Sequence, residues 1–233
     1  MQALPKERFC HYMNVKAAVF DFNGTLFFDY QENEDAWDLT CKEYRGYGLE
    51  KGEFSLFAGM TDTACARLIF PSGSNEKLVE IYTFKERIYK ELCLKRKLQL
   101  AECSIKFIEE LRKRGIKTAI ASSAPVMNME WYIPHFKLNE YFDIMLYGRE
   151  DLPSKPCPDI YLLALKELGV DKSEAICFED AVAGIKAALS AGFAKTYAIE
   201  SPGIDLSATG KLAHLTNWES CLMNIDKLLS LEY

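Results

Sequence analysis

The sequence predicts an α/β protein built on a doubly wound parallel sheet, and three observations support this. An apolar run from Ala17 to Phe20 stops at Asp21 and is followed by the turn pair Asn23-Gly24, which is how a buried parallel strand ends. Segments from 102 to 199 alternate between strand and helix patterns, as in a parallel sheet with helices on both faces. Residues 31–100, between these parts, contain almost no strand pattern.

The first strand is expected at 16–21, and a helical block follows it. Apolar residues recur at helical spacing over 33–47 and over 75–94, and Thr61 or Thr63 is placed to cap a helix between them. We therefore expect a helical cap domain over residues 31–100, inserted into a core domain made of residues 1–30 and 101–233.

The alternating part of the chain supplies the remaining core elements. Strands are expected at 116–121, 143–147, 175–178 and 194–199, and helices at 102–114, 125–136, 158–168 and 182–191. The tail, 211–231, again has apolar residues at helical spacing around Trp218, and residues 1–14 are expected to form a short leader.

Composition narrows the class of protein. Hydrophobic residues make up 49% of the chain and the net charge is -6, so neither nucleic acid nor an anionic membrane surface is an expected partner. The eight cysteines are scattered without a Cys-x-x-Cys pair, which indicates reduced thiols in the cytoplasm. The first residues contain charges without an apolar run after them, and no apolar stretch approaches the ~18 residues of a membrane span. A cytoplasmic monomer is expected.

Polar residues follow several of the predicted strands. They are Asp21, Ser122, Lys155 in a proline-rich loop, and the pair Glu179-Asp180. The carboxyl ends of parallel strands share one edge of a sheet, where such folds bind ligands. Carboxylates there can bind Mg²⁺, a lysine and a hydroxyl can hold a phosphate, and one carboxylate can act as the nucleophile. Taken singly, each residue also has an ordinary explanation: a turn or helix cap for the acids and the serine, a solvated loop residue for the lysine.

Taken together and in this order, the residues resemble the motifs of the haloacid dehalogenase (HAD) superfamily. The first motif, Asp-x-Asp-Gly-Thr-Leu/Val, stands here as residues 21–26, and the second, a Ser or Thr ending the next strand, is Ser122. The third is Lys155-Pro156-Cys157-Pro158, and the fourth is Glu179-Asp180 before a helix of small residues. The subgroup that the chain resembles is the β-phosphoglucomutase-like phosphatases, which have a Rossmann-like core and a C1-type helical cap.

This resemblance implies a role for each matching residue. Asp21 is the nucleophile and a Mg²⁺ ligand, and Asn23 lends its backbone carbonyl to the metal. Glu179 and Asp180 complete the metal site. The implied substrate contacts, for a small phosphorylated molecule, are Thr25, which also steadies the loop, Ser122, Ser123, Lys155 and the cap residue Lys85. Lys85 lies in a Lys85-x-x-x-Tyr89 pattern on a predicted helix, where an ordinary surface lysine is an equal alternative.

The sequence departs from the family pattern at the acid/base position. Phosphatases and mutases of the family carry an Asp two residues after the nucleophile, whereas this chain carries Asn23. An amide neither protonates a leaving alcohol nor activates water, and the loss of such a group typically costs ~10²–10⁴ in rate. Asn33 stands where the mutases have a histidine, and the loop Gly59 to Asp62 lacks their arginine, which argues against mutase activity.

Four explanations of Asn23 remain open. The protein is a slow or restricted phosphatase that acts on good leaving groups such as acyl phosphates, or a pseudoenzyme that keeps a phosphate and metal site. Otherwise Asn23 is an engineered trap, or the Asn23-Gly24 pair deamidates and restores an Asp in part of the sample. We favour a slow or restricted Mg²⁺-dependent phosphatase, because Asn23 replaces the acid/base Asp. It would act on a small phosphorylated metabolite, such as a sugar phosphate, through an aspartyl-phosphate on Asp21. The alternatives are the pseudoenzyme and a phosphotransferase.

Overall fold

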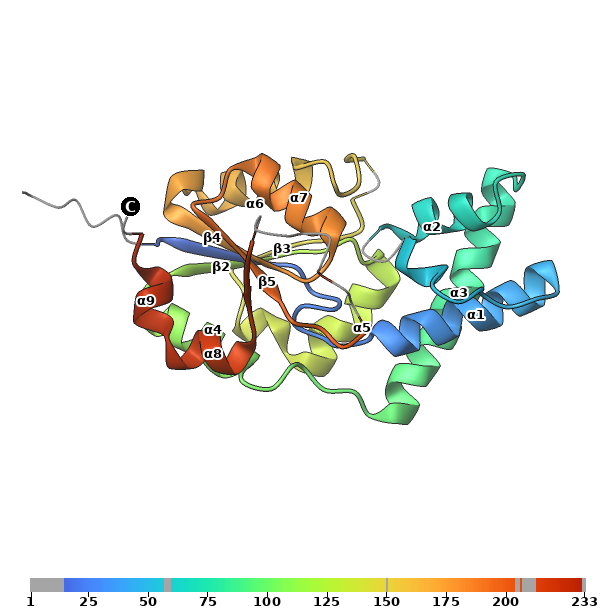
Figure 1. Ribbon diagram of the computed structural model, residues 1–233, viewed down its shortest axis with the longest axis horizontal. Coiled ribbons are helices and arrows are strands. Elements are labelled where there is room, and N and C mark those ends of the chain that lie inside the picture. Colours follow the sequence, from blue (N-terminus) through green and yellow to red (C-terminus); the bar gives the residue numbers. More distant parts are fainter. Residues whose placement is uncertain (1–14, 57–59, 150, 204–205, 207–212, 232–233) are drawn as a thin grey trace, which may run out of the picture.

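A computed structural model describes residues 15–56, 60–149, 151–203, 206 and 213–231, so that the expected leader, 1–14, lies outside the described residues. The chain forms a sheet flanked by helices and, beside it, a group of helices that follows β1 in the sequence (Figure 1).

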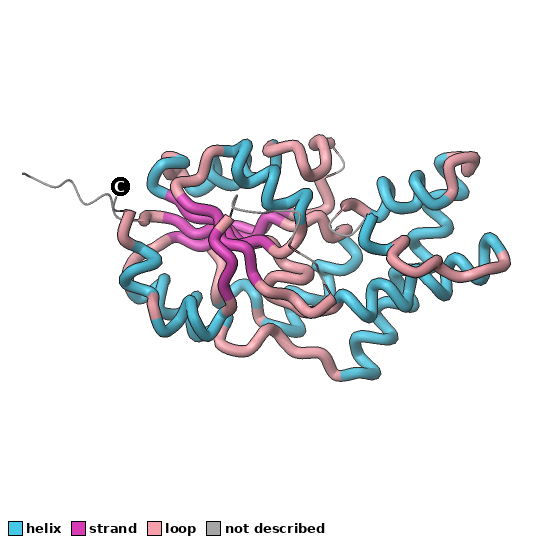
Figure 2. Tube along the Cα trace, viewed as in Figure 1, coloured by secondary structure: helices cyan, strands magenta, loops and turns pink. Residues whose placement is uncertain are grey.

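The sheet has six parallel strands in the order β3-β2-β1-β4-β5-β6. The strands are β1 (Ala17–Phe20), β2 (Lys117–Ala121), β3 (Ile144–Leu146), β4 (Ala175–Glu179), β5 (Lys195–Ile199) and β6 (His214–Thr216). They lie side by side at the centre of Figure 2. The chain builds outward from β1 in one direction through β2 and β3, and then in the other through β4, β5 and β6. This reversal at β1 creates a crevice at the carboxyl ends of the strands.

Alternate residues of the strands face opposite layers of helices. Ala17 and Val19 of β1 pack with α6 (Asp159–Leu168) and α7 (Val182–Ala191), whereas Ala18 and Phe20 pack with the layer on the other face. That second layer contains α4 (Ser104–Lys113), α5 (Val126–Phe136), α8 (Trp218–Met223) and α9 (Ile225–Leu229). Both faces of β1 are thus covered, which explains its continuous apolar sequence.

Three helices between β1 and α4 form what we call the helical unit, residues 30–96. They are α1 (Tyr30–Arg45), α2 (Asp62–Ile69) and α3 (Asn75–Arg96), and they share a hydrophobic cluster that includes Trp37, Leu78 and Ile81. The hydroxyl oxygen of Thr61 accepts a hydrogen bond from the backbone N–H of Ala64, so Thr61 is the expected helix cap. Ala36, Tyr89 and Cys93 also belong to the main core cluster, which ties the unit to the sheet domain.

Short elements complete the structure and include the main difference from the predicted fold. Three 3₁₀ turns span Phe54–Leu56, Leu138–Glu140 and Lys172–Glu174. In the tail, a sixth strand and two short helices replace the simple helical pattern expected there. Strand β6 has only three residues, two of them exposed, so its sequence lacks the apolar signal of a buried strand. Among the described residues, no helix has both the length and the apolar character needed to cross a membrane.

Candidate active site

Asp21 lies where β1 ends, between the two neighbouring strands. Its backbone N–H donates to the carbonyl of Phe178 in β4, at 2.9 Å, so that the position of Asp21 is fixed by the sheet. The chain then folds into a tight loop, in which the N–H groups of Leu26 and Phe27 both donate to the carbonyl of Phe22. The loop therefore presents Asp21 at the switch point of the sheet, as the sequence predicts.

Gly24 allows this loop to approach Asp180. Its φ is +81°, and a Cβ atom built there would lie 2.0 Å from Oδ2 of Asp180. Both facts require glycine, the first because a left-handed backbone disfavours a side chain and the second because no room is left for one. The Asn23-Gly24 pair thus serves close packing between the Asp21 loop and the end of β4.

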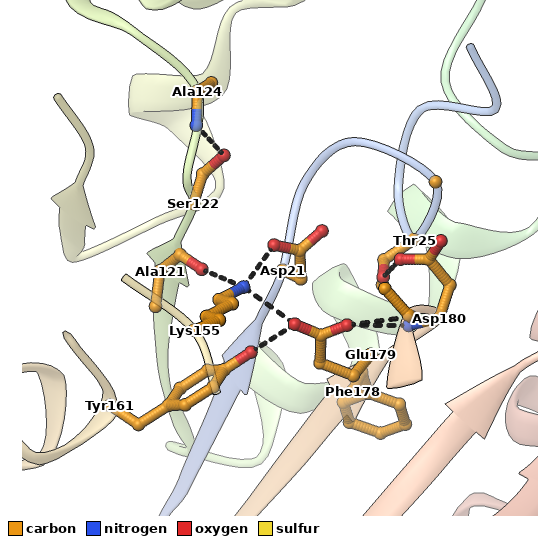
Figure 3. A network of polar contacts seen from close by, with 12 residues as sticks. Asp21, Thr25, Ala121, Ser122, Ala124, Lys155, Tyr161, Phe178, Glu179 and Asp180 are labelled. Carbon is orange, nitrogen blue, oxygen red and sulfur yellow. Dashed lines mark hydrogen bonds and ion pairs between the residues drawn. The ribbon is translucent and has the colours of Figure 1, made fainter. Parts of the chain in front are cut away.

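Lys155 reaches this point from the loop between β3 and α6. Its ammonium donates to Oδ1 of Asp21 at 2.5 Å, to Oε1 of Glu179 at 2.7 Å and to the carbonyl of Ala121 at 3.2 Å (Figure 3). The side chain is only 3% exposed. A buried ammonium with three oxygen acceptors is fully satisfied, and it connects the ends of β1, β2 and β4.

Glu179 and Asp180 end β4, and each is held in a different way. Oε2 of Glu179 accepts hydrogen bonds from the N–H groups of Asp180 and Ala181, at the start of α7, and Oε1 accepts from the hydroxyl of Tyr161 at 2.6 Å. Oδ1 of Asp180 accepts from the hydroxyl of Thr25 at 2.7 Å. Figure 3 shows these side chains converging beside Asp21.

The three carboxylates share a single ammonium, so negative charge is in excess. Burial raises the pKa of Asp21 to about 7 although Lys155 lies beside it, and burial with the charge of Glu179 raises the pKa of Asp180 well above its ordinary value. Burial lowers the pKa of Lys155, but Asp21 and Glu179 outweigh burial and hold it above its ordinary value. One oxygen from each of the three carboxylates lies within 4.8 Å of the others. This hard oxygen set with excess negative charge fits a divalent cation.

Ser122 and Ser123 follow β2 and line the pocket in front of Asp21. The Ser122 oxygen accepts a hydrogen bond from the N–H of Ala124 at 3.0 Å, which fixes its direction and leaves its own proton to donate. The same pocket is lined by Asn23 and Asp180. The structure therefore brings together the residues of all four motifs.

Asn23 is held by a buried polar cluster. Its amide nitrogen donates to Oδ2 of Asp29 at 2.8 Å and also lies 3.0 Å and 3.2 Å from the hydroxyls of Tyr132 and Tyr89. The Tyr89 hydroxyl itself donates to Oδ2 of Asp29 at 2.5 Å. Because a carboxylate accepts and cannot donate, Asp29 fixes which end of the amide faces it.

Two residues expected to contact substrate have other partners. Thr25 has no exposed surface, and its hydroxyl is bonded to Asp180, so it steadies the loop. Lys85 is 2% exposed, and its ammonium is bonded to Asp62 at 3.0 Å and to Glu86 at 2.5 Å. In this structure the polar atoms of both side chains are thus buried and paired inside the protein, and their expected contacts with substrate stay predictions.

Three further residues support the site without having been predicted. Tyr161 orients Glu179, Asp29 orients Asn23, and the indole N–H of Trp218 donates to the carbonyl of Thr25 at 2.9 Å. The sequence did contain a signal for Asp29, which is a single acid among the aromatic residues Phe27, Phe28 and Tyr30. Nothing in the local sequence marks Tyr161 or Trp218.

Comparisons with known proteins agree with this geometry. A family model for haloacid dehalogenase-like hydrolases matches residues 18–198. Protein CbbY of Cereibacter sphaeroides is 31% identical over 201 residues, which are 81% of this chain and 85% of that protein. The phosphorylated carbohydrates phosphatase of Thermotoga maritima is 34% identical over 119 residues, 51% of this chain, and the match spans about half, 53%, of that relative.

Solved structures give the same result. The crystal structure of a HAD hydrolase of family IA, variant 3, from Entamoeba histolytica superimposes with a TM-score of 0.79 at 33% identity, over 88% of this chain and 95% of that one. The predicted superfamily and α/β fold class are confirmed. The phosphatase names of several relatives agree with the predicted phosphoric monoester hydrolase.

Proposed function

The chain belongs to the haloacid dehalogenase-like hydrolase family, and on this premise we propose that it is a Mg²⁺-dependent phosphatase. Its substrate is a small phosphorylated metabolite such as a sugar phosphate, and the helical unit acts as a cap over the site. The observation that carries the proposal is the contact between Lys155 and Asp21 at the end of β1, with Glu179 and Asp180 alongside.

The residues divide the work of phosphoryl transfer. Lys155 holds one oxygen of Asp21, and the other oxygen points away from the lysine (Figure 3). This fixed carboxylate attacks phosphorus and forms the aspartyl-phosphate while the bond from phosphorus to the leaving oxygen breaks. Because Asn23 supplies no proton, the leaving oxygen departs as an anion and takes its proton from solvent. A water then hydrolyses the aspartyl-phosphate, which releases phosphate and regenerates Asp21. The Ser122 hydroxyl binds an oxygen of the transferring group, where negative charge accumulates. Lys155 joins it by exchanging its longest contact, with the Ala121 carbonyl, for a phosphoryl oxygen.

Asp21, Asp180 and the backbone carbonyl of Asn23 would hold the metal, with Glu179 beside them. When bound, Mg²⁺ screens the repulsion between the carboxylate and the phosphate dianion. Glu179 has both oxygens engaged by Lys155, Tyr161 and backbone N–H groups, so its main task is to hold Lys155 in place.

Replacement of Asp21 by asparagine is expected to lower phosphate release by at least about 10³-fold, because the nucleophile is lost while the shape of the site is kept. The assay measures phosphate release from sugar phosphates, nucleotides and acyl phosphates, with and without Mg²⁺. Asp226→Asn, which removes an exposed acid paired with Arg114, serves as the control and should retain full activity. Equal turnover by the Asp21 variant would contradict the proposed nucleophile.

The buried cluster around Asn23 also bears on a second candidate function. An amide held by Asp29, Tyr89 and Tyr132 cannot donate a proton to a leaving alcohol. This observation favours either a phosphatase restricted to good leaving groups or a non-catalytic protein that binds phosphate and metal. Turnover of acetyl phosphate separates the two, because its leaving group needs no acid.

Asn23→Asp is expected to accelerate the hydrolysis of sugar phosphates by about 10²-fold or more at mildly acidic pH, because it restores a general acid. The new carboxyl would face Asp29 across the present 2.8 Å contact. Two carboxyls at that distance share a proton, which raises the apparent pKa of the pair. The gain should therefore fade as the pH rises and the pair loses this proton.

We also expect Asn23→Asp to change how the stability of the protein depends on pH. With a pKa raised in the folded state, the pair binds more protons folded than unfolded, so stability should fall as pH rises above the ordinary carboxyl range. Melting curves and kcat/KM from pH 5 to 9 test both effects, after mass spectrometry has excluded deamidation. Asn128→Asp, in the same pocket, is the charge-matched control. A gain that is equal in this control or independent of pH would count against the acid role.

A further inference from the structure

The wall of the pocket opposite Asp21 is formed by the helical unit and the residues leading into it. Its members are Asp29, Tyr30, Asn33, Phe54, Met60, Asp62 and Tyr89. Among the described residues that line this pocket, none is a lysine or an arginine. Lys155 lies behind Asp21, where it contacts the carboxylate, and does not belong to this wall.

The helical unit contains a buried cation beside this wall, Lys85, and its charge is neutralised by ion pairs within the protein. Its ammonium is bonded to Asp62 and to Glu86 and lies 5.3 Å and 5.1 Å from the ring centroids of Trp37 and Tyr89. Two carboxyl groups thus surround one buried ammonium. Whether Glu86 is ionised or protonated, the group formed by Asp62, Lys85 and Glu86 has no positive excess.

Two side chains of the wall, Asp62 and Asn33, offer hydrogen-bond acceptors to the pocket. Asp62 borders the pocket at the start of α2. Oδ1 of Asn33 is buried and has no partner among the described residues, although Asn33 also lines the pocket. Acceptors of this kind pair with hydroxyl groups. A second phosphate would lose its water without gaining a counter-charge.

We propose that Asp62 is the specificity-determining residue of the helical unit, that it accepts hydrogen bonds from hydroxyl groups of the leaving group, and that it disfavours substrates with a second phosphate. Lys85 and Glu86 are positioning residues that hold Asp62. The proposal rests on the proposed phosphatase function, which it narrows to hydroxylated monophosphates.

A neighbouring pocket is lined by two cations. It shares Asp62, Ser122 and Ser123 with the first and includes Arg149 and Lys155 among its lining residues. The ammonium of Lys155 is paired with Asp21 and Glu179. The guanidinium of Arg149 is likewise paired with both carboxylate oxygens of Asp151, each at 2.7 Å. Asp62 lines both pockets. A substrate that extends from the first pocket toward Arg149 would therefore lie close to the Asp62 carboxylate.

The test compares glucose 1-phosphate with glucose 1,6-bisphosphate, two substrates that differ by a single phosphate. The full chain is expected to hydrolyse the monophosphate with a kcat/KM about tenfold higher or more, because the second phosphate meets uncompensated negative charge. p-Nitrophenyl phosphate, which has no hydroxyl to contact Asp62, reports the phosphatase chemistry itself.

Two variants should move this preference in opposite directions. Asp62→Asn removes one negative charge from the group that includes Lys85 and Glu86 and should reduce the preference for the monophosphate by about fivefold or more. Lys85→Met removes the positive charge of the same group and should increase the preference. A merely structural role would move both variants the same way. Glu91→Gln removes the same charge from an exposed position of α3 and should leave the preference unchanged.

The possible results separate a failure of the Asp62 proposal from a failure of the phosphatase function. Turnover of p-nitrophenyl phosphate together with equal or faster hydrolysis of the bisphosphate would overturn this inference while the phosphatase function stands. Parallel shifts in the two variants would also overturn it. Absence of turnover on every substrate removes the phosphatase function and the inference with it. If Lys85→Met does not fold, the change in Asp62→Asn decides alone.

Discussion

Lys155→Met is expected to abolish turnover and to lower the free energy of unfolding by about 3–5 kcal/mol, the range for breaking a buried ion pair. The variant keeps an unbranched side chain that is one atom shorter, and it removes the ammonium that contacts Asp21, Glu179 and the Ala121 carbonyl. Three buried carboxyl groups then face one another without a cation. Loss of the group that binds the phosphoryl oxygens is expected to cost about 10²–10³ or more in rate.

The pH dependence of the unfolding free energy shows whether the unpaired carboxyl groups cause the loss of stability in Lys155→Met. Without Lys155 the pKa values of Asp21 and Asp180, which burial already raises and the ammonium lowers, rise further. The folded state then binds more protons than the unfolded state, and stability falls as pH rises. The deficit in unfolding free energy should therefore be smaller at pH 5 than at pH 8 in chemical denaturation. Adding Glu179→Gln should recover stability without recovering activity. Lys16→Met, at an exposed pair with Glu174, should change little. A deficit independent of pH would contradict this account.

Gly184→Ala is expected to reduce activity by about 10²-fold or more and to destabilise the protein by about 1–3 kcal/mol, the range for overpacking. In most helices a change from glycine to alanine stabilises the helix by about 0.8–1.0 kcal/mol. A loss of stability in Gly184→Ala would therefore indicate a steric clash at this position. Gly184 lies in α7, and its Cβ would stand 1.7 Å from Oε1 of Glu179. Glu179 would have to move, and Lys155 and Tyr161 would lose their common acceptor.

A double-mutant cycle tests the clash directly. If Glu179 is the obstacle, Gly184→Ala should cost little stability in a Glu179→Ala background, because the two positions are then no longer coupled by overlap. Ser190→Ala, at an exposed position of the same helix, should leave both stability and kcat/KM near those of the original chain. A Gly184→Ala protein with raised stability and full activity would show that α7 tolerates the methyl group.

The strand ends were the most predictable part of the site. Asp21, Ser122 and Glu179 each follow an apolar run, and parallel strands bring such ends to one edge, so their convergence follows from local pattern and topology together. Lys155 was placed by its proline-rich loop. The sequence pattern did not predict the hydrogen-bond partners of these side chains. The hydroxyl of Tyr161, for example, reaches Glu179 only because α6 packs on the sheet.

The features that the sequence did not reveal share a physical cause, which is that tertiary contacts determine burial. Lys85 appears on a helix at a spacing that also suits a surface lysine, and Asp62, 23 residues away, together with Glu86 makes its burial tolerable. Asn23 looks like an isolated substitution in the sequence, yet its partners Tyr89 and Tyr132 come from two distant helices. Strand β6 was missed because a three-residue edge strand that is mostly exposed lacks an apolar signal.

The hydrogen bond between Trp218 and the carbonyl of Thr25 joins residues separated by 193 positions. During synthesis the Asp21 loop therefore leaves the ribosome long before the indole that supports it. The central strand must likewise wait for β4 before both of its edges are paired. A nascent chain can thus contain the complete first motif while the loop that carries Asp21 still lacks the contacts that fix its shape.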